Sequence, residues 1–389
     1  MKTIYQLVLQ VSAVLILAGC AEQKSETTPG DQAATESTEV LALAERAGAP
    51  LFDGMGDYEM PITTEAQDAQ RYFNQGMVLA FAFNHAESIR SFRAAQTLDP
   101  TCAMCFWGEA LATGPNINVT SKGKVIMSAG EREAAFAALQ KALALKDNAT
   151  VREQAYIEAL ATRYNGDAET DREPLDIAWA EAMGSVVKQY PEDMTAASIY
   201  AESLMNTMPW NYWSDDGIAK PETSAVIESL DRVLQAEPDH PLALHLYIHA
   251  LEASNDPSRA ETAADRLANL VPGAGHLVHM PSHIYYRIGR YNDAAVANQR
   301  AADVDEAYIA ACNAQGFYPA LYYPHNIHFL WSAATMQGQS ALSIESARRV
   351  VANVRVEQVQ AFPTVEFFRT VPLLSLVRFG KWDDILEEP

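Results

Sequence analysis

Apolar residues recur at intervals of three and four along most of this chain, the spacing that places them on one face of an α-helix. The pattern begins near Glu65 and continues to the C-terminal region, interrupted by short stretches rich in Gly, Pro and Asn. Alternation of apolar and polar residues, which would indicate β-strands, is absent from the sequence. The pattern therefore predicts an all-α protein in which each helix buries one face.

The helical segments fall into a repeat of 34 residues. Pro238 and Pro272 are separated by this period, and so are Ala260 and Ala294. Small residues let two antiparallel helices approach closely, and large ones fill the space between neighbouring hairpins. This period and pattern are typical of tetratricopeptide repeats, so the sequence predicts a right-handed α-solenoid of helical hairpins. The unit that closes at Pro100 carries the required large and small residues at Tyr72, Gly76, Phe92 and Ala95.

Further Pro and Gly residues mark the boundaries of the repeat units. Pro191 closes an earlier unit, residues 289–291 (Gly-Arg-Tyr) form the turn of a later unit, and Gly338 marks the next turn. The repeat phase breaks between residues 114 and 130, and again near residues 211–213. We expect loop insertions at these two places.

Seven of the nine histidines fall in three short clusters on the first helices of consecutive units. In this repeat architecture, positions 2, 5 and 9 of a first helix project into the concave groove of the stack. Three consecutive units offer nine such positions, and all of them except Leu242 and Ser332 are histidine. Residues three or four apart share a helix face, so each cluster can chelate an ion. The seven candidate metal ligands are His245, His249, His276, His279, His283, His325 and His328.

The ligand type indicates which ions the groove would bind. All-imidazole ligation favours Zn or Cu, then Ni or Fe, over Mg or Ca. Neighbouring first helices in a stack lie roughly 8–10 Å apart, so their imidazoles can meet, and seven of them suffice for one or two ions. Glu202 and Glu252 are candidate ligands, or acceptors that fix a histidine tautomer. His85 and His240 lie off the groove pattern, and we interpret them as structural or surface residues.

Two other functions fit the same groove. The histidines could contact an acidic or aromatic peptide of an envelope protein, which would make the chain a non-enzymatic scaffold. Alternatively, the chain is a metal-dependent enzyme with an open coordination position and Glu202 or Glu252 as general base. Pro281 lies between His279 and His283, where it either kinks the helix and re-aims His283 or simply breaks the helix. No motif for a nucleotide or organic cofactor is present, and metal binding is the leading hypothesis.

A second group of candidate ligands opens the first helix of an early unit. Cys102, Met104 and Cys105 could bind Cu(I) through soft donors, or the two thiols could form a redox disulfide. Two cysteines in the first turn of a helix are also common packing residues. We favour the packing interpretation for that reason. No second cysteine pair is present to complete a zinc ribbon.

The N-terminus has the pattern of a bacterial lipoprotein signal. Lys2 precedes an apolar stretch over residues 4–18 that is too short and too polar to predict a membrane-spanning helix. Leu-Ala-Gly at 17–19 precedes Cys20 and resembles the lipobox, in which the cysteine becomes the acylated N-terminus of the mature protein. Ala21 replaces the Asp that usually retains such proteins in the inner membrane. We therefore expect a lipid anchor in the outer membrane, facing the periplasm.

Composition completes the division into domains. Residues 21 to about 40 are rich in Glu, Gln, Ser, Thr and Ala, and cannot bury enough apolar surface to offset the entropy of ordering. We divide the chain into a signal peptide (1–19), an acylated cysteine with a disordered tether (20–60) and the solenoid (61–389). The formal charge of −22 argues against nucleic acid and against polybasic attachment to lipid. Membrane contact is expected through the lipid anchor only.

Five sequence strings resemble a family of bacterial tetratricopeptide-repeat lipoproteins. They are AFNHAE at 82–87, CAMCFWGEA at 102–110, GPNIN at 114–118, GHLVHMPSHI at 275–284 and PHNIHFLW at 324–331. The resemblance spans about residues 50–389 and implies the repeat fold, but no catalytic role. Members of the family often run longer than this chain. Residues 379–384 likewise look like the turn into a second helix that ends early, so we expect a truncated last hairpin or a partner that covers it.

Overall fold

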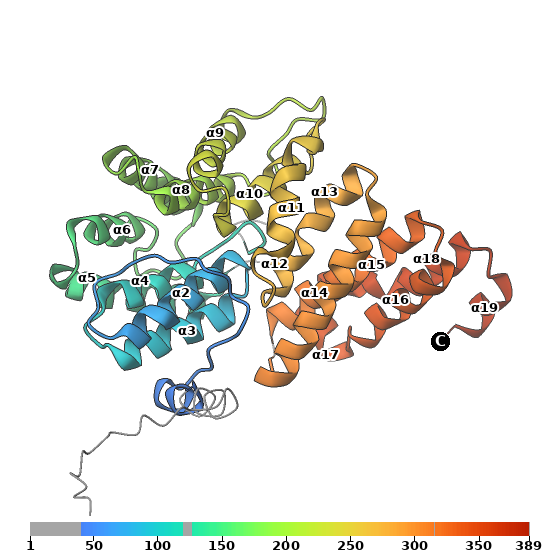
Figure 1. Cartoon of the computed structure of the whole chain (residues 1–389), viewed down its shortest axis with the longest axis horizontal. Helices are drawn as coiled ribbons and strands as arrows, with labels where there is room; N and C mark the ends of the chain where they lie inside the picture. Colours follow the sequence, from blue (N-terminus) through green and yellow to red (C-terminus); the bar gives the residue numbers. More distant parts are fainter. Residues whose placement is uncertain (1–39, 120–126, 315, 389) are drawn as a thin grey trace, which may run out of the picture.

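A computed structural model describes residues 40–119, 127–314 and 316–388. These residues form antiparallel helical hairpins that stack side by side (Figure 1). Within those ranges the extended backbone forms no strand, and only Trp213 and Ala219 make an isolated β-bridge. The predicted all-α solenoid of hairpins is confirmed. The predicted signal peptide and the predicted lipidation site Cys20 lie outside the described residues.

The helices follow one another with short connections. Four short segments with other helical geometry join them: η1 (Lys146–Asn148), η2 (Pro257–Ala260), η3 (Tyr318–Tyr322) and η4 (Pro363–Thr370). The α-helices are α2 (Gln67–Phe81), α3 (His85–Leu98), α4 (Ala103–Thr113), α5 (Ala129–Leu145), α6 (Val151–Ala161), α7 (Glu173–Gln189), α8 (Met194–Thr207), α9 (Pro221–Ala236), α10 (Pro241–Leu251), α11 (Glu261–Leu270), α12 (Gly275–His279), α13 (Pro281–Arg287), α14 (Tyr291–Cys312), α15 (Tyr323–Met336), α16 (Ser340–Ala352), α17 (Val356–Ala361), α18 (Val371–Arg378) and α19 (Trp382–Glu387).

The packing of the hairpins depends on the small and large residues that the repeat predicts. Consecutive helices such as α2 and α3 pack together, and first helices such as α2 and α4 contact each other across hairpins. Phe92 is fully buried, and a Cβ added at Gly76 or Gly108 would lie only 2.8 or 2.3 Å from its ring. Ala260 and Ala294 are also fully buried at helix crossings. Large side chains therefore fit because a glycine or alanine faces them.

The predicted boundaries coincide with the observed helix ends. Pro191, Pro238 and Pro272 each lie between the second helix of one hairpin and the first helix of the next. Gly289 and Gly338 adopt positive φ angles of 84° and 72° in the turns after α13 and α15, a conformation that glycine adopts without steric cost. The longer α4–α5 and α8–α9 connections lie where the repeat phase breaks.

Residues 40–60 pack against the solenoid, so the predicted disordered tether is wrong for this part of the chain. Residues 40–47 are helical, and the side chain of Leu43 is buried in the main core. The Tyr72 hydroxyl donates a hydrogen bond of 2.6 Å to the carbonyl of Ala49. Composition alone misled the prediction, because a few buried apolar side chains are enough to order the segment when side chains of α2 also hydrogen-bond to its backbone. No described helix is both long and apolar enough to cross a membrane.

The stack curls so that its first hairpin lies against later helices (Figure 1). The hydroxyl of Tyr308 on α14 lies 3.3 Å from a carboxylate oxygen of Glu87 on α3. Arg90 on α3 lies within 3.4 Å of the sulfur of Cys312 at the end of α14. Helix α2 also contacts α10. The concave face is therefore enclosed by the first hairpin, whereas the sequence predicts an open groove.

Candidate metal centre

Six of the seven candidate histidines converge in two groups of three. In each group, one nitrogen from every ring lies within 4.8 Å of the corresponding nitrogens of the other two rings. Helix α10 supplies two rings to the first group, α13 and α15 each supply one to the second, and α12 supplies one ring to each. We name these groups triad 1 (His245, His249 and His276) and triad 2 (His279, His283 and His325).

Triad 1 presents buried ring nitrogens that have no hydrogen-bond partner. The Nδ1 atom of His245 lies 2.6 Å from the carbonyl of Phe81, and that of His249 lies 2.9 Å from Oε1 of Glu252. Each acceptor fixes the proton on Nδ1, which leaves Nε2 with a free lone pair. Nε2 of both rings and both nitrogens of His276 are buried and have no hydrogen-bond partner among the described residues. Three imidazole lone pairs are thus available at one point.

Triad 2 holds two of its rings in the same way. His279 Nδ1 lies 2.5 Å from the side-chain oxygen of Asn298, and His283 Nδ1 lies 2.6 Å from Oε2 of Glu252. With both Nδ1 atoms protonated, the two Nε2 atoms face each other with lone pairs only 2.9 Å apart. Two lone pairs at this distance repel unless a cation or a proton lies between them. The ring of His325 completes the group.

Glu252 connects the two triads. Its two carboxylate oxygens accept hydrogen bonds from one ring of each triad, His249 and His283. Burial opposes ionisation of this carboxyl group, but the two facing imidazoles hold the pKa of Glu252 below its ordinary value. The carboxylate is therefore an acceptor that orients two metal ligands, an arrangement common behind metal-binding histidines.

The electrostatic setting keeps five of the six triad imidazoles neutral. Burial lowers the pKa of His245, His249, His276 and His279, and the neighbouring histidines lower it further. Burial lowers the pKa of His325 to about 3. A neutral imidazole is the form that binds a metal ion, so these five rings need not lose a proton first at neutral pH.

The spacing of each triad is close to what an ion requires. Nitrogen ligands 2.0–2.1 Å from a tetrahedral ion lie about 3.3 Å from one another. The observed upper limit of 4.8 Å is wider than this distance. The Nε2 atoms of His279 and His283, 2.9 Å apart, are closer than this distance and would separate slightly around an ion. The adjacent rings His249 and His283, one from each triad, have centroids 5.5 Å apart, so the triads are neighbours.

Aromatic side chains wall both triads. The ring of Phe83 lies 4.6 Å from that of His245 and 5.4 Å from that of His276, centroid to centroid. Phe329 lies 4.6 Å from His283 on the other side. Phe83 has a positive φ of 55°, which is uncommon for a residue with a side chain. The apolar walls keep water from the imidazoles and strengthen their interaction with any bound charge.

Asn118, from the GPNIN string, holds two further rings over triad 1. Its amide nitrogen donates to the Tyr322 hydroxyl (2.9 Å), and its oxygen accepts from the indole N–H of Trp210 (3.2 Å). Tyr322 lies 4.8 Å from the ring of His276, and Trp210 lies 5.0 Å from that of His249. Trp210 has a φ of +60° and an exposed fraction of 50%. It forms the outer edge of the site.

Two predicted ligands lie outside both triads. His328 packs instead among the rings of Trp331, Phe367 and Phe368, because η4 brings the two phenylalanines against it. Glu202 is on α8 and belongs to neither triad. Burial raises the pKa of Glu202 to about 7, against the opposing effect of Arg163.

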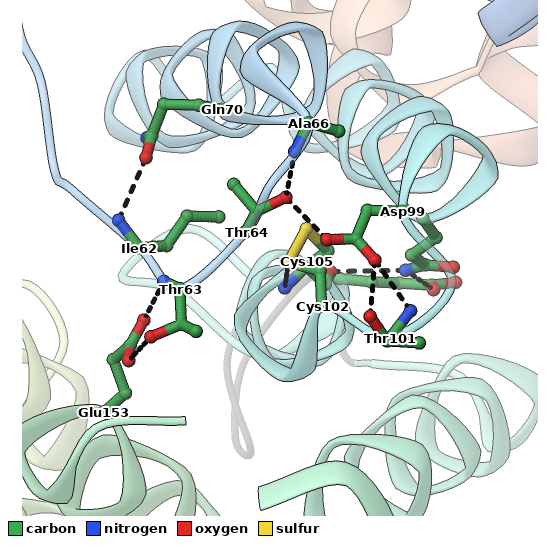
Figure 2. The surroundings of a disulfide bond; sticks show 12 residues. Ile62, Thr63, Thr64, Ala66, Gln70, Asp99, Thr101, Cys102, Cys105 and Glu153 are labelled. Atoms are coloured by element: carbon green, nitrogen blue, oxygen red, sulfur yellow. Dashed lines mark hydrogen bonds between the residues drawn. A yellow bond between two sulfur atoms is a disulfide. The ribbon is translucent and has the colours of Figure 1, made fainter. Parts of the chain in front are cut away.

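Cys102 and Cys105 are joined by a disulfide bond (Figure 2). Both sulfurs are buried at the N-terminus of α4, beside Asp99 and Thr101, and Met104 is buried as well. Cys102 Sγ accepts a hydrogen bond from the backbone N–H of Cys105. The predicted packing role and the predicted disulfide are therefore compatible. The Cu(I) interpretation does not fit this arrangement, because disulfide sulfurs carry no thiolate.

Sequence reasoning missed two acceptors of the site. Asn298 lies on α14, where its amide nitrogen donates to the carbonyl of Ala294 and thereby turns its oxygen toward His279. An Asn in the interior of a predicted helix is unusual, so the sequence itself could have indicated that Asn298 has a specific hydrogen-bonding role. The carbonyl of Phe81 left no signal, because it reaches His245 only through the closure of the stack.

Comparisons with known proteins give the following matches. No protein-family model and no curated protein matches the sequence. Among solved structures, the chain is similar to one titled "Crystal Structure of the Yeast Tom70", with 11% identity over 83% of each chain and a TM-score of 0.28. A likeness at this TM-score says nothing about what this chain binds. The interpretation of the site rests on its geometry.

Proposed function

We propose that this chain is an envelope lipoprotein that binds transition-metal ions, one at each triad, inside a tetratricopeptide-type scaffold. The observation that carries the proposal is the set of buried ring nitrogens on His245, His249 and His276 that find no hydrogen-bond partner in the described part of the chain. A buried polar atom without a partner costs free energy, roughly 1–3 kcal/mol. An ion bound at the triad would satisfy these nitrogens together.

The second triad supports the same proposal independently. The facing Nε2 atoms of His279 and His283 have their opposite nitrogens occupied by Asn298 and Glu252. This is the arrangement by which proteins orient metal-binding histidines. Zn and Cu are the preferred ions for nitrogen ligands, ahead of Ni and Fe.

Burial favours an ion over a peptide as the occupant of this site. The five most buried rings of the triads are at most 7% exposed: His245, His249, His276, His279 and His283. A peptide that docks in a groove needs exposed side chains to contact. The hairpin stack has other surfaces for protein partners, as stacked repeats generally do. The enzyme alternative assigns the general base to Glu202 or Glu252, and both oxygens of Glu252 already accept hydrogen bonds from His249 and His283.

Metal analysis of the full chain, purified without a histidine tag, tests the proposal. We expect two equivalents of a tightly held first-row transition ion after dialysis against each metal in turn. The double variant His276→Phe with His325→Phe should lose both, since it removes one ligand from each triad. Neither ring makes a side-chain hydrogen bond in the described part of the chain. The substitutions therefore deprive no described partner of a hydrogen bond.

His328→Phe is the matched control, because His328 already lies among aromatic rings and belongs to neither triad. It should retain both ions. Less than one equivalent of metal in the wild-type protein would refute the proposal, and full binding by the double variant would place the ligands elsewhere. The lipid anchor is tested separately: Cys20→Ser should move the protein from the detergent-rich phase to the aqueous phase on detergent partitioning.

A further inference from the structure

The two triads offer only neutral ligands. Within the described part of the chain, the groups that could hold an ion at these positions consist of histidines alone. The nearest carboxylate, Glu252, turns both oxygens toward the Nδ1 atoms of His249 and His283, away from the ligand nitrogens. It can offset charge at a distance, but it does not bind the ion directly.

This ligand set constrains the charge of the bound ions. Two divalent cations beside the single charge of Glu252 would leave three positive charges uncompensated in a buried site. Two monovalent cations would leave one. The cost of burying an ion rises steeply with its charge, so monovalent ions are favoured here. Asp305 and Glu202 belong to neither triad.

The number of ligands points in the same direction. Zinc in proteins is almost always four-coordinate, and a site with three protein ligands takes its fourth from water or substrate. The walls around these triads are aromatic rings, among them Phe83, Tyr322 and Phe329. Cu(I), a monovalent d¹⁰ ion, is stable with three ligands and requires no water.

We infer that the ions of this site are Cu(I), one in each triad, each held by three imidazole nitrogens. The inference rests on the proposed function and specifies its metal, oxidation state and coordination number. Glu252 is the shared acceptor that orients one ligand of each ion, and among the described residues its carboxylate is the one that hydrogen-bonds to the triads. The disulfide-bonded Cys102 and Cys105 take no part.

An anaerobic competition titration tests this inference. The metal-free full chain, without a histidine tag, is titrated with Cu(I) in the presence of the chromophoric chelator bicinchoninate. We expect two equivalents to be withheld from the chelator, and X-ray absorption of the product to show three nitrogen neighbours and no sulfur. A tenfold excess of Zn²⁺ should not displace the copper.

Single variants assign the two ions. His276→Phe and His325→Phe should each withhold one equivalent of Cu(I), and the control His328→Phe should withhold two. Circular dichroism checks that each variant is folded, and the wild-type titration decides the inference even if one is not.

The outcomes separate this inference from the proposed function. Fewer than two equivalents of Cu(I), four-coordinate copper or displacement by Zn²⁺ would overturn the Cu(I) assignment. If Zn²⁺, Ni²⁺ or Co²⁺ then binds to the triads, the proposed metal-binding function stands without it. If no ion binds at all, both fail.

Discussion

At the scale of single residues, Glu252 is the side chain on which both triads depend. Its two oxygens fix the tautomers of His249 and His283. In Glu252→Gln, the amide oxygen can accept from one ring only, and the amide N–H₂ faces the Nδ1–H of the other. That ring must move its proton to Nε2, which removes it as a ligand. We expect the affinity for at least one ion to fall by about 10- to 100-fold.

The measurement combines metal competition with nitrogen NMR of the imidazoles. The NMR spectrum should show one ring with its proton moved from Nδ1 to Nε2, which a general loosening of the fold would not produce. Glu202→Gln is the control, because Glu202 lies outside both triads. Unchanged affinity for both ions in Glu252→Gln would show that the carboxylate does not orient the ligands.

The residues that sequence reasoning could and could not place differ in a physical way. His245 with His249, and His279 with His283, were predicted together because residues four apart share a helix face. The division of His276 and His279 between different triads depends on how neighbouring hairpins are rotated. The spacing of residues along one helix does not predict how neighbouring hairpins are rotated relative to each other. The double contact of Glu252 was likewise hidden, because it joins two hairpins.

At the scale of elements, α12 is the short helix that supplies one ligand to each triad, His276 and His279. Its first residue, Gly275, lies against Asp305 on α14, where an added Cβ would be 2.0 Å from Oδ1. Asp305 cannot move away easily, because Tyr318 and Asn326 both donate hydrogen bonds to its carboxyl group. The position of α12 is thus fixed by this glycine.

Gly275→Ala should therefore displace α12 and weaken both triads at once. We expect a loss of about 1–3 kcal/mol in the free energy of unfolding, as for other overpacked sites, together with reduced affinity for both ions. Urea unfolding and metal titration measure the two effects. Gly130→Ala on α5 is the control, since nothing lies within 4 Å of its added Cβ. Normal metal affinity in Gly275→Ala would show that α12 tolerates the displacement.

Pro281 shows how the same element differs from its prediction. The proline separates α12 from α13, and the N–H of His283 bonds to the carbonyl of Met280 rather than to that of His279 four residues back. Met280 nevertheless keeps right-handed helical angles. His279 and His283 therefore remain on one side, with their Nε2 atoms 2.9 Å apart. The proline breaks the hydrogen-bond pattern without re-aiming His283, which agrees with the plainer of the two interpretations.

At the scale of the whole molecule, closure of the stack buries the histidines of the predicted groove. The carbonyl of Phe81 reaches His245 across 164 residues of sequence, and Asn118 reaches Tyr322 across 204. The repeat pattern predicts each hairpin and the spacing between hairpins, but the curvature accumulates from small rotations at every interface. Burial of the histidines follows from that curvature, and it sets the response of the fold to acid.

In the metal-free protein, burial lowers the pKa of most histidines. These rings stay neutral in the folded state, whereas the same residues in the unfolded chain bind protons near pH 6.5. Below that pH the histidines of the unfolded state bind protons, whereas those of the folded state do not. The free energy of unfolding therefore falls as the pH decreases. The affected residues are His85, His240 and His328, each with a pKa of about 4, His325 with a pKa of about 3, and His245, His249, His276 and His279.

Three carboxyl groups act in the opposite direction. Burial raises the pKa of Glu202 and of Asp305 to about 7, so their contribution is full below the unfolded values near 4 and is lost as the pH rises to 7. Partial burial raises the pKa of Glu237 as well. Eight imidazoles outweigh three carboxyls, and each imidazole contributes about 1.4 kcal/mol per pH unit between its two pKa values. We therefore expect the melting temperature of chelator-treated protein to fall steeply between pH 6.5 and pH 4. A melting temperature that is constant over this interval would show that the histidines are hydrated in the folded state, and that the two triads are open to water.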